Sequence, residues 1–408
     1  MKLLFLQKRI LFPANTGGKI RTLNVLRHLA QWHDITYLCN VQAGDAPYLN
    51  EMQNMGMRLE TIPWREAPRN SLRFYFDLAR NLASSYPFTV AKDFDPALRR
   101  RAKELLSAES FDLVICDFVQ MAENAIGLSA PASVLFQHNV EAEIFRRHAE
   151  SNSSWLRRRY MALQWQKMRR YEAAAGQHFD AVIAVSQHDQ AIFEKEYGWR
   201  HVRTIGTAVD VDYFSPRGLA EVPELVVFVG SMDWLPNEDG VLDFCQRTWP
   251  LIREPHPQAR FQIVGRHPTA AVQRLEGIAG VEVVGSVPDV RPYLEQAAVI
   301  VVPLRIGGGT RIKIFEALAM SKALVSTTIG AEGLPVSAGE HLILADKPVD
   351  FAHAVCELFD SAASRRELGM RGHSYIIQRF SAEQVARQFE SICRETATRQ
   401  QPRVPVPA

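Results

Sequence analysis

Residues Ile306 to Met320, IGGGTRIKIFEALAM, decide the fold assignment of this chain. Three glycines, Gly307, Gly308 and Gly309, follow the apolar run Ala297 to Leu304 and precede a run of helix-forming residues. A strand, a glycine-rich turn and a helix N-terminus form a phosphate site, because small residues let backbone N–H groups approach an oxyanion and the helix dipole favours negative charge. The stretch therefore predicts a βα unit that binds a nucleotide-type ligand.

Side chains at the start of the expected helix supply matching chemistry. Thr310 suits a helix N-cap, and Arg311 and Lys313 offer cations to a phosphate. Glu316 lies three residues after Lys313, so a helix places both on one face. Its carboxylate can accept hydrogen bonds from a sugar diol, although a surface ion pair with Lys313 is the alternative.

The composition is that of a globular protein with reduced thiols. The length of 408 residues suggests two to three domains, and 47% hydrophobic and 23% charged residues are ordinary for a globular chain. Five scattered cysteines without a C-x-x-C pair indicate neither a disulfide frame nor a zinc site. A net charge of +2, without an RNA-binding module, argues against a nucleic-acid partner.

The N-terminus and the hydropathy predict a cytoplasmic location. Met1 to Leu6 holds too few apolar residues before Lys8 and Arg9 to be a signal peptide. No apolar run approaches the roughly 20 residues of a membrane span.

Short apolar runs alternate with longer segments of helical period along the whole chain. Such continuous apolar strands imply parallel sheets buried on both faces. The expected strands are Leu3–Leu6, Ile35–Val41, Leu113–Cys116, Ser133–Phe136, Ala181–Val185, Leu225–Val229, Phe261–Val264, Val281–Val284, Val299–Val302 and Ala323–Ser326.

These strands predict an α/β protein with two Rossmann-like, doubly wound domains. The expected bounds are 1–205 and 217–380, followed by a C-terminal helix over 381–399 that returns to the first domain. Residues 400–408 are proline-rich and are expected to be a frayed tail. Ligands of such domains bind at the carboxyl ends of the strands, so we expect the active site in the cleft between the two domains.

The chain lacks the sequence motifs of several common enzyme classes. There is no G-x-G-x-x-G after the first strand, no G-x-x-x-x-G-K-[ST], no H-E-x-x-H and no G-x-S-x-G. Two D-x-D triplets occur, at 93–95 and 210–212, but the first precedes Pro96 and reads better as a helix cap. We therefore expect no metal requirement.

Motifs along nearly the whole chain resemble those of family 4 retaining glycosyltransferases, which have two Rossmann-like domains in the GT-B architecture. Two further stretches, MDWLPNEDG and PLRIGGGTRIKIFEALAM, resemble a subgroup associated with bacterial exopolysaccharide assembly. The matching segments are PANTGG (13–18), FQHNVE (136–141), VS (185–186), VDVDYF (209–214), FVG (228–230), IVG (263–265) and the glycine-rich stretch itself.

The resemblance implies a set of site residues. Gly17 and Gly18 would approach the donor phosphate and acceptor, and His138 would lie near the transferred sugar. Gly230 and the stretch Gly307–Glu316 would bind the donor, a nucleotide-diphosphate sugar of UDP or GDP type. The acceptor would be a saccharide or lipid-linked saccharide, attacked on the front face without a dedicated protein base.

The chain also departs from the family pattern. Gly308 stands where the family has the first of two glutamates, eight residues before Glu316. Ser231 and Pro236-Asn237 stand where the family has phosphate-binding cations. Leaving-group charge must still be stabilised, so the nearest replacements are Arg311 and Lys313, with Arg266 and Arg305 behind them.

Simpler roles remain open for the first-domain residues. Gly17 and Gly18 could form only the entry turn of a helix. His138 could cap the following helix or pair with Glu141.

The segment 146–170 is basic and carries interleaved aromatic residues. Such a helix can lie on an anionic membrane, where a lipid-linked acceptor would be found, or it can pack its aromatics on the first domain. Packing is the favoured interpretation, and peripheral contact with the inner membrane is the alternative. The residues concerned are Arg146, Arg147, Trp155, Arg157, Arg158, Arg159, Tyr160, Trp165, Lys167, Arg169 and Arg170.

The sequence thus predicts a retaining, hexosyltransferase-like enzyme of exopolysaccharide or cell-surface glycan synthesis. Two other functions stay open: a GT-B-type nucleotide-sugar epimerase, and a non-catalytic nucleotide-sugar-binding scaffold. The missing glutamate and arginine make the scaffold plausible.

Overall fold

The computed structural model describes residues 1–14, 16–66, 68, 71–151, 154–306 and 312–399. Its internal contacts divide the chain into two compact units. The first unit comprises Met1–Gly206 together with the chain from Val385 onward, and the second comprises Thr207–Gln384.

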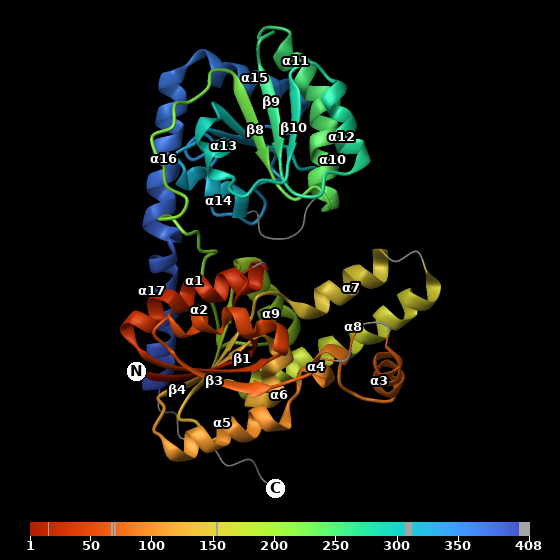
Figure 1. The fold of residues 1–408 in the computed structure, drawn as a ribbon, viewed down its shortest axis with the longest axis vertical. Helices are drawn as coiled ribbons and strands as arrows, with labels where there is room; N and C mark the ends of the chain where they lie inside the picture. The colour runs from red at the N-terminus through yellow and green to blue at the C-terminus, as the bar shows by residue number, and fades with distance from the viewer. Residues whose placement is uncertain (15, 67, 69–70, 152–153, 307–311, 400–408) are drawn as a thin grey trace. The chain divides into compact units, whose positions relative to one another are not determined.

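The first unit is built on a parallel sheet with the strand order β3-β2-β1-β4-β5-β6-β7 (Figure 1). This is the order of a doubly wound Rossmann-like sheet with one strand added. The strands are β1 Lys2–Arg9, β2 Asp34–Val41, β3 Arg58–Pro63, β4 Leu113–Asp117, β5 Ser133–Phe136, β6 Ala181–Ala184 and β7 Val202–Thr204.

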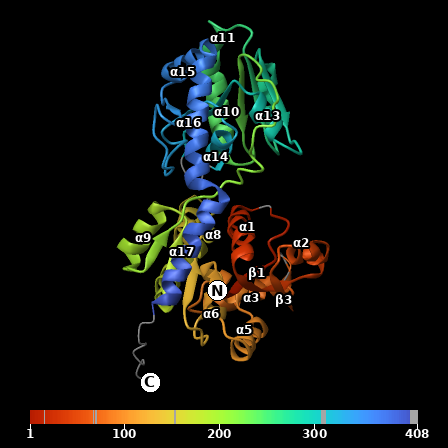
Figure 2. The same cartoon turned by 90° about the vertical axis from the view of Figure 1, so that its left-hand side faces the viewer.

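Helices cover both faces of this sheet, with α1 and α5 on opposite faces (Figures 1 and 2). The central strand β4, LVICD, is buried throughout because it is covered on both sides. The helices are α1 Gly17–Trp32, α2 Leu49–Gln53, α3 Leu72–Leu82, α4 Phe88–Asp93, α5 Pro96–Ala108, α6 Ala122–Ala125, α7 Glu141–Ser151, α8 Trp155–Ala175 and α9 Gln187–Tyr197, with short 3₁₀ turns at Ala43–Tyr48, Val119–Met121 and Gly176–His178.

Local sequence signals set the helix ends in the first unit. Asp95 caps α5 by accepting a hydrogen bond from the N–H of Ala97 at 2.9 Å, and Pro96 fits the first helical position. The first D-x-D triplet therefore contributes a helix cap, as its sequence context indicated. Gly198 ends α9 with φ of 68°, a left-handed conformation that suits glycine.

The last helix, α17 (Ala382–Thr398), packs on the first unit as the sequence predicted. The ring of Phe389 stacks edge-on against Phe136 at 5.0 Å, and Glu390 pairs with His33 at 3.1 Å. Arg387 lies over the ring of Trp32 at 4.5 Å. The C-terminal segment therefore closes the first core.

The second unit repeats the doubly wound plan with the strand order β10-β9-β8-β11-β12-β13 (Figure 1). The strands are β8 Leu225–Val229, β9 Arg260–Val264, β10 Val281–Gly285, β11 Val299–Val302, β12 Leu324–Ser326 and β13 Ile343–Leu344. The helices are α10 Leu235–Asp243, α11 Trp249–Arg253, α12 Ala270–Gln273, α13 Arg291–Gln296, α14 Ile312–Ala319, α15 Pro348–Asp360 and α16 Ala362–Phe380, with a π-helical turn at Phe244–Thr248 and a 3₁₀ turn at Arg274–Gly277.

Each unit has its own hydrophobic core, and the predicted α/β class with two Rossmann-like domains is confirmed. All five cysteines are free thiols.

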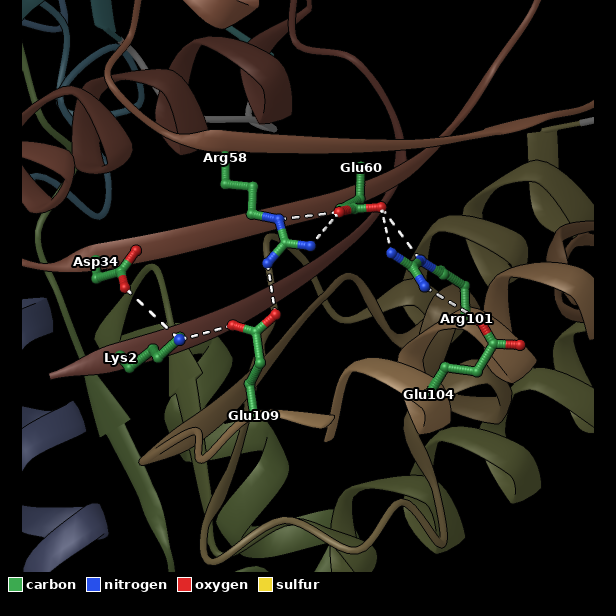
Figure 3. Close-up of polar contacts among 7 residues, drawn as sticks. All are labelled: Lys2, Asp34, Arg58, Glu60, Arg101, Glu104 and Glu109. Carbon is green, nitrogen blue, oxygen red and sulfur yellow. Dashed lines mark hydrogen bonds and ion pairs between the residues drawn. The ribbon is translucent and has the colours of Figure 1, made fainter. Parts of the chain in front are cut away.

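A network of ion pairs fastens the amino ends of β1, β2 and β3, at the edge of the sheet opposite to the expected site (Figure 3). Lys2 contacts Glu109 at 2.6 Å, and Arg58 contacts both Glu109 and Glu60 at 2.6 and 2.7 Å. Arg101 reaches Glu60 at 3.1 Å. The charges of these side chains are paired with one another, so we interpret this edge of the sheet as structural rather than as a binding site.

Candidate functional site

His138 lies directly beyond β5, at the carboxyl edge of the first sheet, and its side chain is fully buried. Its ring stacks on Phe118 at 4.0 Å and contacts the ring of Phe136 at 4.2 Å. Phe118 follows β4 and has φ of 69°, an unusual value for a non-glycine residue. The turn after β4 thus closes over the histidine.

Both ring nitrogens of His138 are engaged. Nε2 lies 2.6 Å from Oδ1 of Asp117, and Nδ1 lies 3.3 Å from a guanidinium nitrogen of Arg21. Because an arginine can only donate, Nδ1 is the acceptor, and Nε2–H donates to the carboxylate. Burial chiefly lowers the pKa of His138, opposed by Asp117 and assisted by Arg21. The imidazole is therefore held neutral in one tautomer.

Asp117 is the centre of this network. Gln7 donates to its Oδ2 at 2.5 Å, and the Thr22 hydroxyl donates to the same atom at 2.8 Å. The carboxylate is completely buried and has donors on both oxygens, as a buried charge requires. The sequence placed Asp117 at this edge but gave no further support for a role.

The alternatives for His138 do not match this arrangement. The first backbone N–H groups of α7, on Glu141 and Ala142, donate to Glu172 of α8 at 2.9 and 3.1 Å. Glu172 also accepts from Gln137 at 2.8 Å. Glu172 is thus the residue that caps α7 and holds the segment around His138. The sequence did not predict this role because Glu172 lies about 30 positions after the residues that it contacts.

Gly17 and Gly18 begin α1 and differ in their surroundings. A Cβ on Gly17 would meet nothing within 4 Å, whereas one on Gly18 would lie 2.5 Å from Cζ of Phe118. Gly18 is therefore required for close packing of α1 against the ring that stacks on His138. Gly17 is exposed and leaves its backbone accessible.

A pocket of about 460 Å³ opens at the same edge of the first unit. Its charged wall residues are the cations Lys8, Arg9, Lys19 and Lys92 and the carboxylates Glu66 and Asp93. Glu66 pairs with Arg9 at 2.8 Å and with Lys92, and these cations together with Lys8 lower its pKa despite burial. Cations outnumber carboxylates here, which favours a ligand carrying negative charge.

A second pocket of about 620 Å³ adjoins the first and shares Glu66 and Lys92 with it. Trp64 lines it, with Lys8 and Arg9 over its ring at 5.3 and 5.5 Å. The sequence reasoning missed this cluster because it follows β3, which was not predicted.

In the second unit, the ends of β8 and β9 are packed backbone to backbone. A Cβ on Gly265 would overlap the carbonyl oxygen of Gly230, and a Cβ on Gly230 would lie 2.6 Å from Nζ of Lys313. Lys313 extends from α14 to donate to Oδ1 of Asn237 at 2.7 Å and lies 4.2 Å from the centre of the Phe228 ring. A cation of α14 therefore reaches the end of β8.

Glu316 lies one turn after Lys313 on α14 and is partly buried. Burial raises the pKa of its carboxyl to about 7, and Lys313 acts in the opposite direction. A carboxyl with this pKa can change charge near neutral pH.

The other predicted cations have different surroundings. Arg266 donates to the Ser231 hydroxyl at 2.9 Å at the end of β9. Arg305 forms two bonds to Asp239, at 2.7 and 3.0 Å, and one to Asp243 at 2.8 Å, so its charge is balanced within α10. Gly307, Gly308, Gly309, Thr310 and Arg311 lie outside the described residues.

No cluster of three or more metal-ligating side chains is present in the described parts of the chain. Within the same residues, no helix is both long and apolar enough to cross a membrane.

Family models match both units. Residues 16–213 match the model described as Glycosyltransferase Family 4, and residues 223–361 match the model described as Glycosyl transferases group 1. Together the two matches cover most of the chain, and they identify it as a glycosyltransferase related to family 4. A Klebsiella pneumoniae protein described as an uncharacterized 44.6 kDa protein in the cps region is 22% identical over 404 residues, covering 94% of this chain and 97% of its own.

Solved structures share the GT-B fold. Anabaena HepE in complex with UDP superposes with a TM-score of 0.66 at 14% identity, covering 97% of this chain and 100% of its own. Sucrose-phosphate synthase from Thermosynechococcus elongatus gives a TM-score of 0.65 at 16% identity, covering 97% and 98%. A mutant of Staphylococcus aureus TarM in complex with Fondaparinux, alpha-GlcNAc-glycerol and UDP gives a TM-score of 0.62 at 11% identity, covering 96% of this chain and 99% of its own.

Proposed function

We propose that this protein is a retaining, hexosyltransferase-like enzyme that transfers a sugar from a nucleotide-diphosphate sugar to a saccharide or lipid-linked acceptor. The pathway we propose is exopolysaccharide or cell-surface glycan synthesis, on the cytoplasmic side of the inner membrane. The cps-region relative and the UDP and UDP-glucose complexes of HepE support this proposal.

The observation that carries the donor assignment is the position of Lys313. Its ammonium group lies 2.6 Å from where a Cβ on Gly230 would be, just after β8, and donates to Asn237 in the first turn of α10 at 2.7 Å. This chain lacks the family's usual cations at Ser231 and Asn237, and Lys313 is a described cation that reaches this turn from α14. We assign it to the diphosphate, where it would stabilise the charge of the leaving group.

The remaining roles follow from chemistry at each position. Gly230 would give the phosphate access to backbone, with Arg266 beside it, and Glu316 would accept hydrogen bonds from the ribose hydroxyls. Gly307–Arg311 are proposed to complete the phosphate site. The first unit would bind the acceptor, with Gly17 exposing backbone toward the substrates.

The role of His138 on the transferred sugar is part of the same proposal. Since its side chain is fully buried, direct contact would require Arg21 or Phe118 to move. The alternative is that His138 acts as a positioning residue by holding the Arg21 guanidinium. No protein base is required, because the leaving phosphate would take the acceptor proton on the front face.

The test compares Lys313→Met with Lys347→Met, which removes an exposed lysine of the same unit. Calorimetry with UDP, GDP and ADP should show affinity for one of them, weakened about 10- to 100-fold by Lys313→Met only, the cost of a lost charge-assisted bond. Donor turnover should require an acceptor. Turnover without acceptor would indicate an epimerase, and binding without turnover a scaffold.

A further inference from the structure

Helix α3 exposes a row of large apolar side chains. Leu72 is 90% exposed, Phe76 67%, Tyr75 55% and Leu82 53%. Tyr75 and Phe76 lie three and four residues after Leu72, and Leu82 lies seven residues after Tyr75. In a helix, these spacings place the four side chains along one side. A soluble protein rarely leaves four such groups in water on eleven residues.

The inner side of α3 explains why the helix holds its orientation. Phe74 packs edge-on against Phe88 at 5.7 Å, and the buried Asn81 accepts from Gln164 of α8 at 3.0 Å. Lys167 of α8 donates to the carbonyl of Asn81 at 2.6 Å. Ser71 caps the helix by accepting from the N–H of Phe74 at 3.2 Å. The apolar row therefore faces outward on a fixed helix.

The charges around this row are mainly positive. Arg73 and Arg80 of α3 are exposed, and Asp77 between them is the only acidic residue of the helix. The first turn of α8 adds exposed Trp155 and Leu156, followed by three exposed arginines, Arg157 to Arg159. From Trp155 to Tyr171 the sequence has no Asp or Glu. The chain as a whole is nearly neutral, so this excess is local.

The first turn and the later turns of α8 therefore differ in their exposure. Trp165, in the later turns of α8, packs against the core of the first unit, as the packing interpretation predicts. Tyr171, just beyond the basic segment, packs there as well. The first turn projects outward, and Figure 1 shows it on the same side of the unit as α3.

We propose that α3 is a membrane-docking helix whose apolar row inserts into an anionic phospholipid surface, with Arg73, Arg80 and the start of α8 contacting headgroups. Large apolar groups beside arginines that outnumber the acidic residue of the helix are the composition of an interfacial helix. The pocket of about 620 Å³ is lined by Arg73, Phe74 and Arg80 of the same helix. Docking would therefore bring this pocket to the lipid surface, and this last step rests on the proposed lipid-linked acceptor.

The experiment is co-sedimentation of the full chain with vesicles of phosphatidylcholine, alone or mixed with phosphatidylglycerol. Binding should require the anionic lipid and weaken with salt. The double variant Leu72→Ser, Phe76→Ser should lose at least about tenfold in partitioning, and Arg73→Gln about fivefold. The control Val349→Ser removes a side chain that is 66% exposed in the second unit and should bind as wild type.

Two results would overturn the inference. One is equal binding of the double variant and wild type to anionic vesicles. The other is a dimer in solution that the double variant dissociates, which would make a second copy the occupant. Melting temperatures verify that each variant is folded. Because Leu72 and Phe76 lie outside both pocket linings, the double variant should keep wild-type turnover of a water-soluble acceptor. Loss of vesicle binding with such turnover intact separates docking from catalysis.

Discussion

The Nε2 atom of His138 lies 2.6 Å from Oδ1 of Asp117, and both side chains are fully buried. Removing the imidazole would leave a buried carboxylate with one fewer donor and a cavity beneath Phe118. We expect His138→Ala to destabilise the first unit by about 2–4 kcal/mol, measured by urea unfolding. The same variant should retain affinity for free nucleoside diphosphate.

The catalytic role of His138 requires a variant that stays folded. His138→Gln can still donate to Asp117, so most of the lost stability should return. If His138 acts on the sugar, this variant should still lose kcat by about 10²-fold or more. A near-normal kcat per folded molecule would leave only the positioning role, and a KM change without a kcat change would point to Arg21.

The neighbouring glycines provide a matched pair. Gly17→Ala places a methyl group in open space at the start of α1 and should leave stability unchanged or raise it by up to about 1 kcal/mol. Gly18→Ala drives the methyl group into Phe118 and should cost about 1–3 kcal/mol. Thermal unfolding of the two variants measures the difference.

Activity then separates structure from function at this turn. If backbone at Gly17 approaches a substrate, Gly17→Ala should reduce kcat/KM although its melting temperature is preserved. Full activity in Gly17→Ala would limit the glycines to the entry turn of α1.

The fold was predictable because its central strands are short apolar runs between amphipathic helices. Ser133–Phe136, Leu225–Val229 and Val299–Val302 have the bounds that the sequence indicated. The strands that were missed, β3, β7 and β13, lie at sheet edges and are partly exposed or only two or three residues long. These three edge strands lack the continuous apolar pattern on which the prediction depends, whereas the edge strand β10 has apolar residues enough to be predicted.

The surroundings of the site were less predictable than its location. The sequence placed His138 at a strand end, but its contacts with Arg21 and Thr22 join residues more than a hundred positions apart. The pocket around Glu66 was invisible for a similar reason, since it follows an edge strand. Such contacts depend on how strands are ordered in the sheet, which local patterns do not encode.

The sequence named Arg305 as a reserve cation for the phosphate, but its side chain is paired with Asp239 and Asp243. We therefore expect that it does not bind the nucleotide. Its side chain is 46% exposed, so Arg305→Gln should change stability by less than about 1 kcal/mol. Nucleotide affinity should stay within about twofold of wild type. A loss by calorimetry as large as that of Lys313→Met would mean that Arg305 leaves its partners to bind phosphate.

Glu316 makes the stability of the folded protein depend on pH. Its pKa is raised from 4.5 to about 7 in the folded protein, so the folded state binds the proton more tightly than the unfolded state. The stability from this group is complete below pH 4.5 and is lost as the pH rises to about 7. Glu316→Gln removes this loss, so its stability relative to wild type should increase from pH 5 to pH 8, on the order of 1–2 kcal/mol after allowing for partial exposure.

Ligand binding should show the opposite trend in the wild type. Ribose hydroxyls donate to a carboxylate, so nucleoside-diphosphate affinity should rise from pH 6 to pH 8 as Glu316 ionises. The diphosphate itself titrates in this range, and the 2′,3′-dideoxy nucleotide supplies the control because it has the same phosphates without the diol. The ratio of the two affinities should rise with pH in the wild type and stay flat in Glu316→Gln. A ratio that is independent of pH in both proteins would remove Glu316 from the ribose site.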